Sequence, residues 1–411
     1  MVTPRIIARE HHTISRQQID PDALKVMNRL RQYSHTAYLV GGGVRDLLLK
    51  RTPKDFDIGT SAHPNEVKKI FRNCWVVGRR FRLAHVKFGR KTIEVATFRQ
   101  QGLANSETAS DSRLRSPIAR DNTFGSPEED AFRRDFTING LFYDVGTLTV
   151  IDYVGGTVDL QNRLIRCIGD PNERFVEDPV RMLRAVLFAE RLSFRLDTPI
   201  RKAIDRHHQK ISQAAPARLL EELYKILRSG VARKILRSLS RKKLLQHIAP
   251  EIELGQSAAL WRSLDRLDAF RRGSSSSSVE LGTPVLLGSV VVPITETNTR
   301  RRRSIEDTGP AAIKLGQLPI ARRDIERLSR IVALQVKLID ATLPPRSIRG
   351  VLARHYFRDA LNWFTIHRNE PDVVKRWTTL ANASGNLLQN TTKKPRKRLR
   401  RRRRYRDQIR P

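Results

Sequence analysis

Cysteine is scarce in this chain of 411 residues, and long apolar runs are missing. The two cysteines, Cys74 and Cys167, lie far apart, which excludes a disulfide framework and the paired spacing of a zinc site. The ten histidines do not form a pattern typical of a metal site. The longest candidate apolar run, Val285–Ile294, is too short to cross a bilayer core of about 30 Å, and residues 1–10 lack the apolar stretch of a secretory signal. We therefore expect a cytoplasmic protein without a membrane partner.

Acidic residues are also in short supply, with 42 Asp and Glu against 78 Lys and Arg and a formal net charge of +36. Residues 393–410 hold twelve basic side chains and one acid, and the rest of the chain still carries +25. An excess of this size predicts a nucleic-acid partner, because unpaired like charges on a merely solvated surface repel one another.

The C-terminal segment has too few apolar groups to fold alone, so we expect a disordered basic tail. A solvated appendage without a binding role is the alternative. The same two interpretations apply to the basic stretch Gly78–His85. The side chains expected to bind RNA are Arg79, Arg80, Lys393, Lys394, Arg396, Lys397, Arg398, Arg400, Arg401, Arg402, Arg403 and Arg404.

The hydrophobic pattern predicts an α+β chain with a small mixed sheet in an N-terminal head and helices thereafter. The expected strands are Tyr38–Val40, Phe56–Ile58, Trp75–Val77, His85–Phe88 and Thr92–Phe98, with a hairpin of Phe142–Val145 and Thr149–Tyr153. The expected divisions are an N-terminal extension (1–20), the head (21–160), a helical neck (161–230), a helical body (231–380) with a flexible insert near 272–306, and the tail (381–411). Within the insert, Val285–Val292 fits either a strand or a buried helix.

Two aspartates, Asp55 and Asp57, follow the glycine run Gly41–Gly43 within twenty residues. If residues 55–57 lie on a strand, both carboxylates project from one face and suit Mg²⁺, a hard cation that keeps water and phosphate oxygens as its other ligands. The glycines let the backbone approach a ligand, and Val44–Leu49 predicts a helix start, whose free N–H groups favour phosphate. Alone, each feature is as readily a turn or a solvated strand edge. Together they predict a nucleotide site.

Two further segments carry charges with both a chemical and a structural explanation. Glu94 alternates with apolar neighbours and is either a third carboxylate of a two-metal phosphoryl-transfer site or a charge on a surface strand. Asp135, next to Arg134, can accept from ribose hydroxyls while the arginine neutralises phosphate, or it can cap a helix.

The segment Glu177–Arg184 also has two explanations. Asp178 before Pro179 fits a helix start, and Glu177 can pair with Arg181 four residues later. Alternatively, an acid and an arginine held side by side match the donor and acceptor of the adenine edge, so that a base could be selected without a template.

Taken in order, these motifs resemble one family. The matching segments are LVGGGVRDLLL, DFDIGT, IEVATFR, RRDFTINGLFYD, IDYVGGTVDL and EDPVRMLRAV. They are similar to the class II nucleotidyltransferases, which include tRNA CCA-adding enzymes and bacterial poly(A) polymerases. GRRFRLAHV, RDNTFGSPEEDAFRRDFTING and the arginine-rich C-terminus favour the poly(A) polymerase branch.

The resemblance implies a nucleotidyltransferase head and assigns roles by position. Asp55, Asp57 and Asp135 would be catalytic, and Asp55, Asp57 and Glu94 would hold two Mg²⁺ ions. The nucleotide-binding residues would be Gly42, Gly43, Arg45, Arg134, Asn139, Glu177, Asp178, Arg181 and Arg184.

The expected activity is template-independent addition of AMP from ATP to RNA 3′ ends, with release of pyrophosphate, as in mRNA polyadenylation. A CCA-adding enzyme is the alternative within the same chemistry, and a catalytically silent basic RNA-binding protein is the alternative outside it. RNA 3′ ends and ATP are the expected partners, and proteins that degrade or bind RNA are further candidates.

Overall fold

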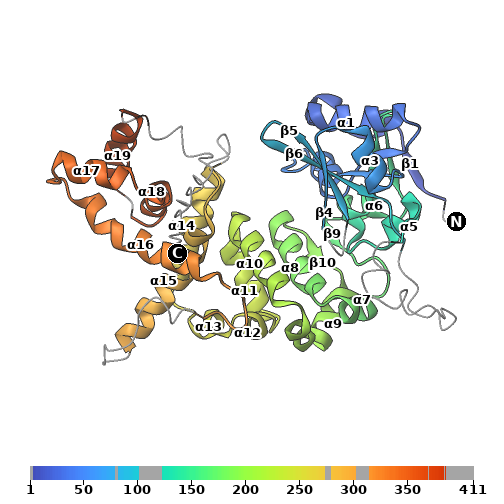
Figure 1. The fold of residues 1–411 in the computed structure, drawn as a ribbon. Coiled ribbons are helices and arrows are strands. Elements are labelled where there is room, and N and C mark those ends of the chain that lie inside the picture. Colours follow the sequence, from blue (N-terminus) through green and yellow to red (C-terminus); the bar gives the residue numbers. More distant parts are fainter. Residues whose placement is uncertain are drawn as a thin grey trace, which may run out of the picture. The chain divides into compact units, whose positions relative to one another are not determined.

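Figure 1 shows the computed structural model, which describes residues 3–78, 82–100, 123–273, 279–301, 314–368, 370–383 and 385. The chain divides into two compact units, one formed by residues 1–256 with 314–319 and the other by residues 257–313 with 320–411. The first unit contains the sheet and the predicted catalytic residues. The predicted divisions after residues 160 and 230 fall inside this unit and remain predictions.

Eight strands form one mixed sheet in the first unit, in the order β1-β8-β7-β2-β3-β6-β5-β4. β3 and β6 run parallel, and the other neighbours run antiparallel. The strands are β1 (Arg5–Ile7), β2 (Ala37–Val40), β3 (Ile58–Thr60), β4 (Cys74–Val77), β5 (Leu83–Phe88), β6 (Lys91–Thr97), β7 (Leu141–Asp144) and β8 (Thr149–Asp152). The expected mixed sheet and the β7–β8 hairpin are confirmed.

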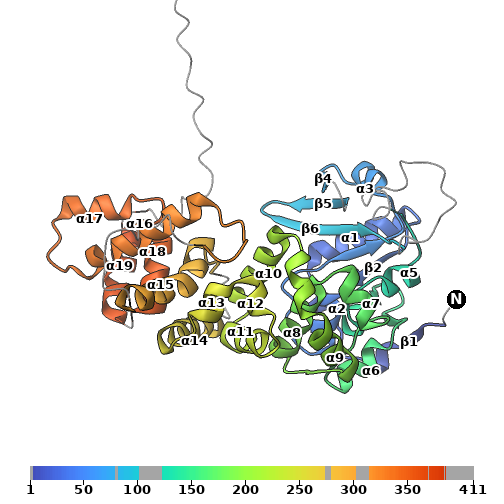
Figure 2. The ribbon, with the colours of Figure 1, turned by 90° about the horizontal axis from the view of Figure 1, so that it is seen from below.

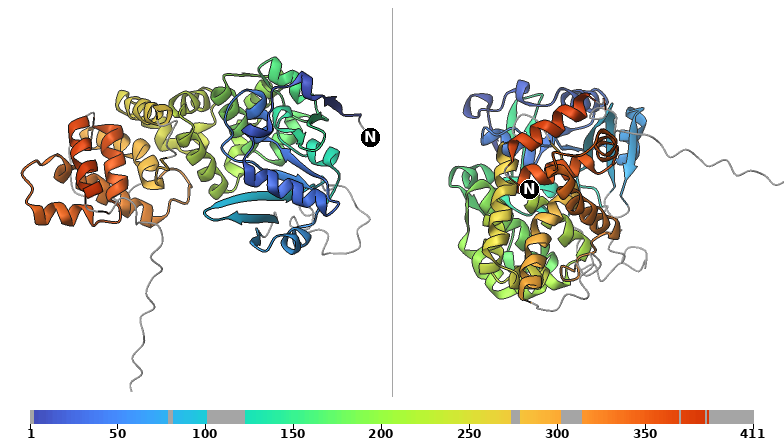
Figure 3. Two further views of the ribbon diagram at one scale, coloured as in Figure 1. Left: turned by 90° about the horizontal axis from the view of Figure 1, so that it is seen from above. Right: turned by 90° about the vertical axis from the view of Figure 1, so that its left-hand side faces the viewer.

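Helices α1 (Pro21–Gln32) and α3 (Pro64–Ile70) pack on one face of the sheet (Figure 2). A further view shows α1 against the strands (Figure 3). The side chain of Asp20 caps α1 by accepting from the N–H groups of Asp22 and Ala23, and Pro21 occupies the first turn. The helix buries Val26, Met27 and Leu30 at helical spacing, so the segment is fixed both by its cap and by its apolar stripe.

The predicted strand over Phe56–Ile58 is wrong in its start, because β3 begins at Ile58. Asp57 still extends the pairing, since its carbonyl accepts from the N–H of Val40 at 3.0 Å. Asp55 and Phe56 lie in the connection between α2 and β3, after Pro53, which has no N–H to donate to a ladder. The two carboxylates therefore stand at the end of a strand instead of on its pleated surface.

The predicted N-terminal extension contributes to the sheet. Residues Arg5–Ile7 form β1, which pairs antiparallel with β8 at the sheet edge. His12 Nε2 lies 2.9 Å from the carbonyl of Leu148, and Arg16 donates to the carbonyl of Val145 at 2.6 Å. The sequence did not predict β1, because its three side chains are exposed or half-exposed and show no alternation of apolar and polar residues.

Helices follow the sheet in the first unit, and only two short strands, β9 (Leu164–Ile165) and β10 (Arg195–Leu196), interrupt them among the described residues. This arrangement confirms the α+β fold class. The helices are α2 (Gly42–Leu48) and α5 (Pro127–Phe132) within the head, then α6 (Gly156–Gln161), α7 (Pro171–Glu177), α8 (Val180–Leu192), α9 (Thr198–His207), α10 (Pro216–Arg228), α11 (Ala232–Arg241), α12 (Leu245–Ile248) and α13 (Pro250–Leu254).

The second unit is helical throughout its described part. Its helices are α14 (Ala258–Gly273), α15 (Thr283–Arg301), α16 (Arg322–Ile339), α17 (Pro345–Leu352), α18 (Phe357–His367) and α19 (Pro371–Ala383). Helix α15 makes Val285–Val292 a mostly buried helix and not a strand. Residues 274–278 and 302–306 of the predicted insert lie outside the described residues, so the flexibility of its ends stays a prediction. A Cβ atom on Gly288 would lie 2.5 Å from Leu328 and Trp363, so α15 packs closely against α16 and α18.

No helix in the described ranges combines the length and the apolar character needed to cross a membrane.

Candidate active site in the head

The glycine run turns the chain from β2 into α2. Gly41 has φ +67°, a conformation that favours glycine, and a Cβ atom there would lie 2.7 Å from the guanidinium of Arg134. α2 starts at Gly42, two residues before the predicted start, so the free N–H groups of its first turn belong to the glycines. A cleft of about 460 Å³ opens here and is lined by all three glycines and by Asp55 and Asp57.

The predicted carboxylates Asp55, Asp57 and Glu94 line a second hollow of about 470 Å³, which shares Lys54, Asp55 and Asp57 with the cleft. Burial raises the pKa of Asp57 to about 6, and the negative charges of Glu94 and Asp55 add to this, while Arg134 opposes it. Asp57 keeps an accessible surface, so it belongs to the wall of a cleft and not to a core. The Glu94 carboxylate also lies 3.7 Å from His85 Nε2.

These carboxylates fit a hard cation. Within the part of the chain that the structure describes, no three His, Cys, Asp or Glu side chains gather closely enough to hold a metal ion unaided. A cation between Asp55 and Asp57 would relieve the repulsion that raises the pKa of Asp57, and it would take its remaining ligands from water or phosphate oxygens. The oxygen donors and their unbalanced charge therefore suit Mg²⁺, with Glu94 as the predicted third donor.

Arg134 is held in the cleft by a residue that sequence reasoning missed. Asp130, on α5, accepts from Arg134 at 2.8 Å and from Arg133 at 2.7 Å, and its side chain is only 3% exposed. Both arginines lower the pKa of Asp130 and outweigh the effect of burial. Arg134 also donates to the carbonyl of Asn139 at 3.1 Å. The spacing of three and four residues between Asp130 and the two arginines was the available signal.

Asp135 lies at the centre of a polar network instead of capping a helix. Its Oδ2 accepts from Arg184 Nε at 2.7 Å, and its Oδ1 accepts from Asn139 Nδ2 at 3.1 Å. Burial disfavours the ionised carboxylate, but Arg184 and Asn139 outweigh burial and lower the pKa of Asp135. Asn139 in turn accepts from Arg45 at 2.6 Å. Four predicted site residues from three elements are thus joined in one network.

The predicted base-selecting residues lie at the junction of α7 and α8. Asp178 accepts from both terminal nitrogens of Arg218 at 2.9 and 2.8 Å, and the pKa of Asp178 is lowered because these bonds outweigh burial. Arg181 donates to Glu177 at 2.8 Å, as the predicted pair requires. None of Glu177, Asp178 and Arg181 lines the cleft; their helix reaches it one turn later through Arg184.

Phe188 and Arg191, which line the cleft, had no motif to mark them. Phe188 lies beneath the guanidinium groups of Arg45 and Arg184, at 5.1 and 5.4 Å from its ring centre. Arg191 on the same helix and Lys54 beside the aspartates add positive charge to the wall. Phe188 and Arg191 follow Arg184 by four and seven residues on α8, a spacing that puts all three side chains on one face of the helix. The sequence does not show that this face lines the cleft until the position of Arg184 is known.

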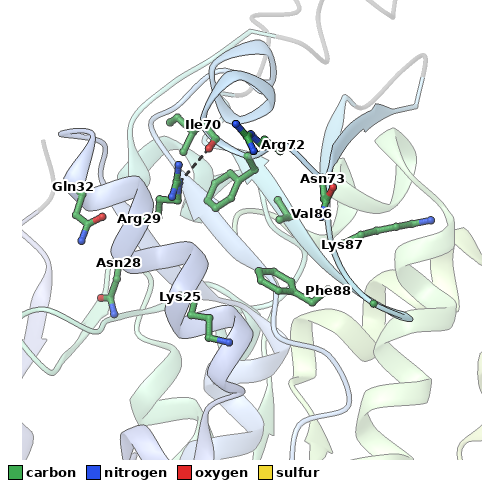
Figure 4. Close-up of a pocket in the computed structure, with 12 residues that line it drawn as sticks. Lys25, Asn28, Arg29, Gln32, Ile70, Arg72, Asn73, Val86, Lys87 and Phe88 are labelled. Atoms are coloured by element: carbon green, nitrogen blue, oxygen red, sulfur yellow. Dashed lines mark hydrogen bonds between the residues drawn. The ribbon is translucent and has the colours of Figure 1, made fainter.

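Another hollow, of about 750 Å³, lies elsewhere on the head, between α1, the end of α3 and β5 (Figure 4). Lys25, Arg29 and Arg72 surround the rings of Phe71 and Phe88 there. None of the predicted catalytic residues lines it. Its size therefore does not identify the reaction site, which the carboxylates and glycines locate instead.

Arg79, Arg80 and the tail residues from Lys393 to Arg404 lie outside the described residues. Their contacts with RNA stay predictions.

Two segments of the chain match protein families. Residues 37–166, which span the glycines, the carboxylates and the Asp135 network except Arg184, match the poly A polymerase head domain. Residues 193–254 match the probable RNA and SrmB-binding site of polymerase A. The chain is therefore similar to poly(A) polymerases over its head and over a following RNA-binding segment.

Named relatives include both poly(A) polymerases and CCA-adding enzymes. Poly(A) polymerase I of Salmonella typhi is 52% identical over 249 residues, which cover 60% of this chain and 54% of the relative. The CCA-adding enzyme of Anoxybacillus flavithermus is 36% identical over 258 residues, covering 61% and 62%. The crystal structure of the Bacillus stearothermophilus CCA-adding enzyme in complex with CTP matches with a TM-score of 0.61 at 25% identity, covering 89% of this chain and 83% of that one. The chain thus spans about half the length of the poly(A) polymerases that it matches.

Proposed function

We propose that the protein is a template-independent RNA 3′-end adenylyltransferase that adds AMP from ATP and releases pyrophosphate. The observation that carries this proposal is the cleft in which Asp55 and Asp57 face the glycine turn of α2 and a fixed set of arginines. The 52% identity with poly(A) polymerase I over the head and the following helices supports AMP as the added nucleotide.

The glycine turn and the arginines suit a triphosphate. The N–H groups at the start of α2 favour anionic oxygens, and Arg134 is held beside them by Asp130. Because Asp130 is buried and already paired, Arg134 keeps its position without a ligand and needs little rearrangement when phosphate arrives. Positioning and charge stabilisation of this kind account for most catalysis of phosphoryl transfer.

Asp55 and Asp57, with Glu94, would hold Mg²⁺. Ions held by these residues would supply activation of the attacking RNA hydroxyl and stabilisation of charge on the leaving pyrophosphate. Asp135 is held ionised by Arg184 and Asn139, so it can accept from the hydroxyls of the nucleotide sugar. The chain's own contribution is thus to fix the phosphates and the sugar on either side of the carboxylates.

Base selection is proposed for Asp178 and Arg181. Arg218 and Glu177 hold these two side chains by ion pairs, so the acceptor and the donors keep a fixed relative position. Adenine presents a complementary donor and acceptor. A rigid Asp178–Arg181 pair would discriminate against a base that has its hydrogen-bond donor and acceptor in the opposite positions. One polar group in the contact would then lack a hydrogen-bond partner.

Removal of one carboxylate tests the catalytic assignment. Asp55→Asn and Asp57→Asn should each reduce ATP incorporation into an RNA primer by at least about a hundredfold, since several kcal/mol of metal-dependent stabilisation is lost. Primer binding, measured by filter retention, should persist. Asp22→Asn on α1 is the control and should retain full activity. Near-normal incorporation by either active-site variant would refute the assignment.

The second candidate is CCA addition, which the similarity to CCA-adding enzymes favours. A tRNA lacking its terminus, incubated with CTP and ATP separately and together, distinguishes the two activities. Long products with ATP alone support adenylation. A stop after C, C and A identifies a CCA-adding enzyme, and the absence of Mg²⁺-dependent extension on all RNAs identifies a silent RNA-binding protein.

A further inference from the structure

One row of side chains crosses the sheet from the catalytic carboxylates to its edge. Trp75 on β4 is paired with His85 on β5, and His85 is paired with Glu94 on β6. The β3–β6 register, Ile58 opposite Val95, places Asp57 beside Glu94. Directly opposed residues of antiparallel strands share a face, and strands lie about 4.8 Å apart, so Trp75 stands about 10 Å from Glu94 along this row.

This face of the β4–β6 strands is open. Cys74, Val86 and Ile93 occupy the other face and are buried, whereas Trp75 is 51% exposed. Lys87, two residues after His85, lies on the same face as Trp75, and its Nζ is 5.1 Å from the indole ring centre. In Figure 4 the Phe88 side chain faces the hollow beside α1, whereas the Lys87 side chain extends outward from the strand, although Lys87 also borders this hollow.

Two hollows adjoin at the aspartates, and Lys54, Asp55 and Asp57 line both of them. Gly41–Gly43 and the arginines line the first hollow, which suits the triphosphate. Glu94 and Thr92, which share one face of β6, line the second hollow. A primer whose 3′ hydroxyl reaches the carboxylates through the second hollow would pass its last few nucleotides over the open face.

We infer that Trp75 and Lys87 bind the nucleotides just upstream of the primer's 3′ end, with a base stacked on the indole and a phosphate near the ammonium. The inference rests on the proposed function. Stacking on an aromatic ring accepts any base, because every base has a π-face, which suits an enzyme that extends many RNAs. The ammonium supplies one salt-dependent phosphate contact. The continuity of the row with Glu94 and Asp57 favours RNA over a protein as the occupant.

Primer binding and extension by the full chain test this inference. Trp75→Ala should raise the KM for an oligo(A) primer about tenfold and leave kcat at saturating primer within about twofold, because stacking acts on binding. Trp75→Phe should restore most of the affinity. Lys87→Ala should lower the salt slope of binding by about 0.7, the value for one phosphate of a single strand. Tyr33→Ala is the matched control, since Tyr33, the C-cap residue of α1, is 54% exposed and also has a cation, Arg29, over its ring.

A binding readout separates this inference from the proposed activity. Primers with 2-aminopurine at the third nucleotide from the 3′ end should change fluorescence on binding to the unaltered protein and to Tyr33→Ala, but much less on binding to Trp75→Ala. Equal fluorescence changes and equal KM values for Trp75→Ala and the unaltered protein would overturn the inference. That result is also the one expected if Trp75 binds another protein instead of RNA. Failure of the unaltered protein to extend RNA with ATP would instead refute the proposed function.

Discussion

The raised pKa of Asp57 gives the sharpest test of how the carboxylates are arranged. An isolated aspartate has a pKa near 3.8, whereas that of Asp57 is about 6 because of burial, then Glu94, then Asp55. In the metal-free protein, the folded state therefore binds a proton at Asp57 in the window between these values, and the unfolded chain does not. Folding is accordingly favoured as the pH falls through this window, and the contribution is lost as the pH rises above about 6.

Metal affinity should follow the same titration, because a proton and a cation compete for the carboxylate. For a pKa of about 6, the apparent affinity for Mn²⁺, used as a spectroscopic substitute for Mg²⁺, should be about twofold weaker at pH 6 and about tenfold weaker at pH 5 than at pH 8. Electron paramagnetic resonance of free Mn²⁺ measures this affinity. Carbon NMR of labelled aspartate, assigned by loss of the signal in Asp57→Asn, measures the pKa without metal.

Neighbouring substitutions separate the causes. Glu94→Gln should lower the pKa of Asp57, and Asp55→Asn should lower it less, following the order of their effects. Asp22→Asn on α1 should leave it unchanged. A titration of Asp57 near 3.8, or one that Glu94→Gln does not move, would refute the placement of these three carboxylates around one site.

Three further predictions concern the supporting residues. Asp130→Asn should destabilise the fold by about 2–3 kcal/mol and raise the KM for ATP, because it leaves Arg134 without its buried partner; thermal denaturation and steady-state kinetics measure the two effects. The Asp130 pair itself stabilises the protein above the ordinary carboxyl pKa and loses this effect as the pH falls through the lowered pKa. Arg218→Ala should change the free energy of unfolding by less than about 1 kcal/mol, since Arg218 is 46% exposed. It should nevertheless reduce the preference for ATP over CTP in single-nucleotide extension. An unchanged ratio of ATP to CTP incorporation would exclude Asp178 from base selection. Deletion of the residues after Asn390 should weaken RNA binding and flatten its salt dependence without altering nucleotide choice.

Local sequence patterns predicted the head well where cap and periodicity agree. Leu24, Met27 and Leu30 recur at helical spacing and predict a helix over Ala23–Tyr33. The structure has α1 over nearly the same residues, because Asp20 and Pro21 fix its start. The start of β3 was wrong, because a strand needs pairing along its length and only Asp57 of the preceding residues has a backbone bond to β2. β1 was missed because its pairing partner, β8, lies more than a hundred residues away in sequence.

The site was predictable as a set of residues but not as a network. The motifs named Arg45, Asp135, Asn139 and Arg184, and the structure joins these four by hydrogen bonds. Nothing local in the sequence indicates those bonds, since Arg184 lies 49 residues after Asp135. The pairing of Asp178 with Arg218 is equally non-local. The motifs thus identify the residues of the site, whereas the hydrogen bonds that hold each side chain in place depend on the fold.

One diffraction experiment tests the central claim most directly. Crystals of the protein with Mn²⁺ and a non-hydrolysable ATP analogue should give an anomalous peak between the carboxylates of Asp55 and Asp57, with the phosphates against Gly41–Gly43. A peak elsewhere, with the nucleotide away from this cleft, would contradict the account.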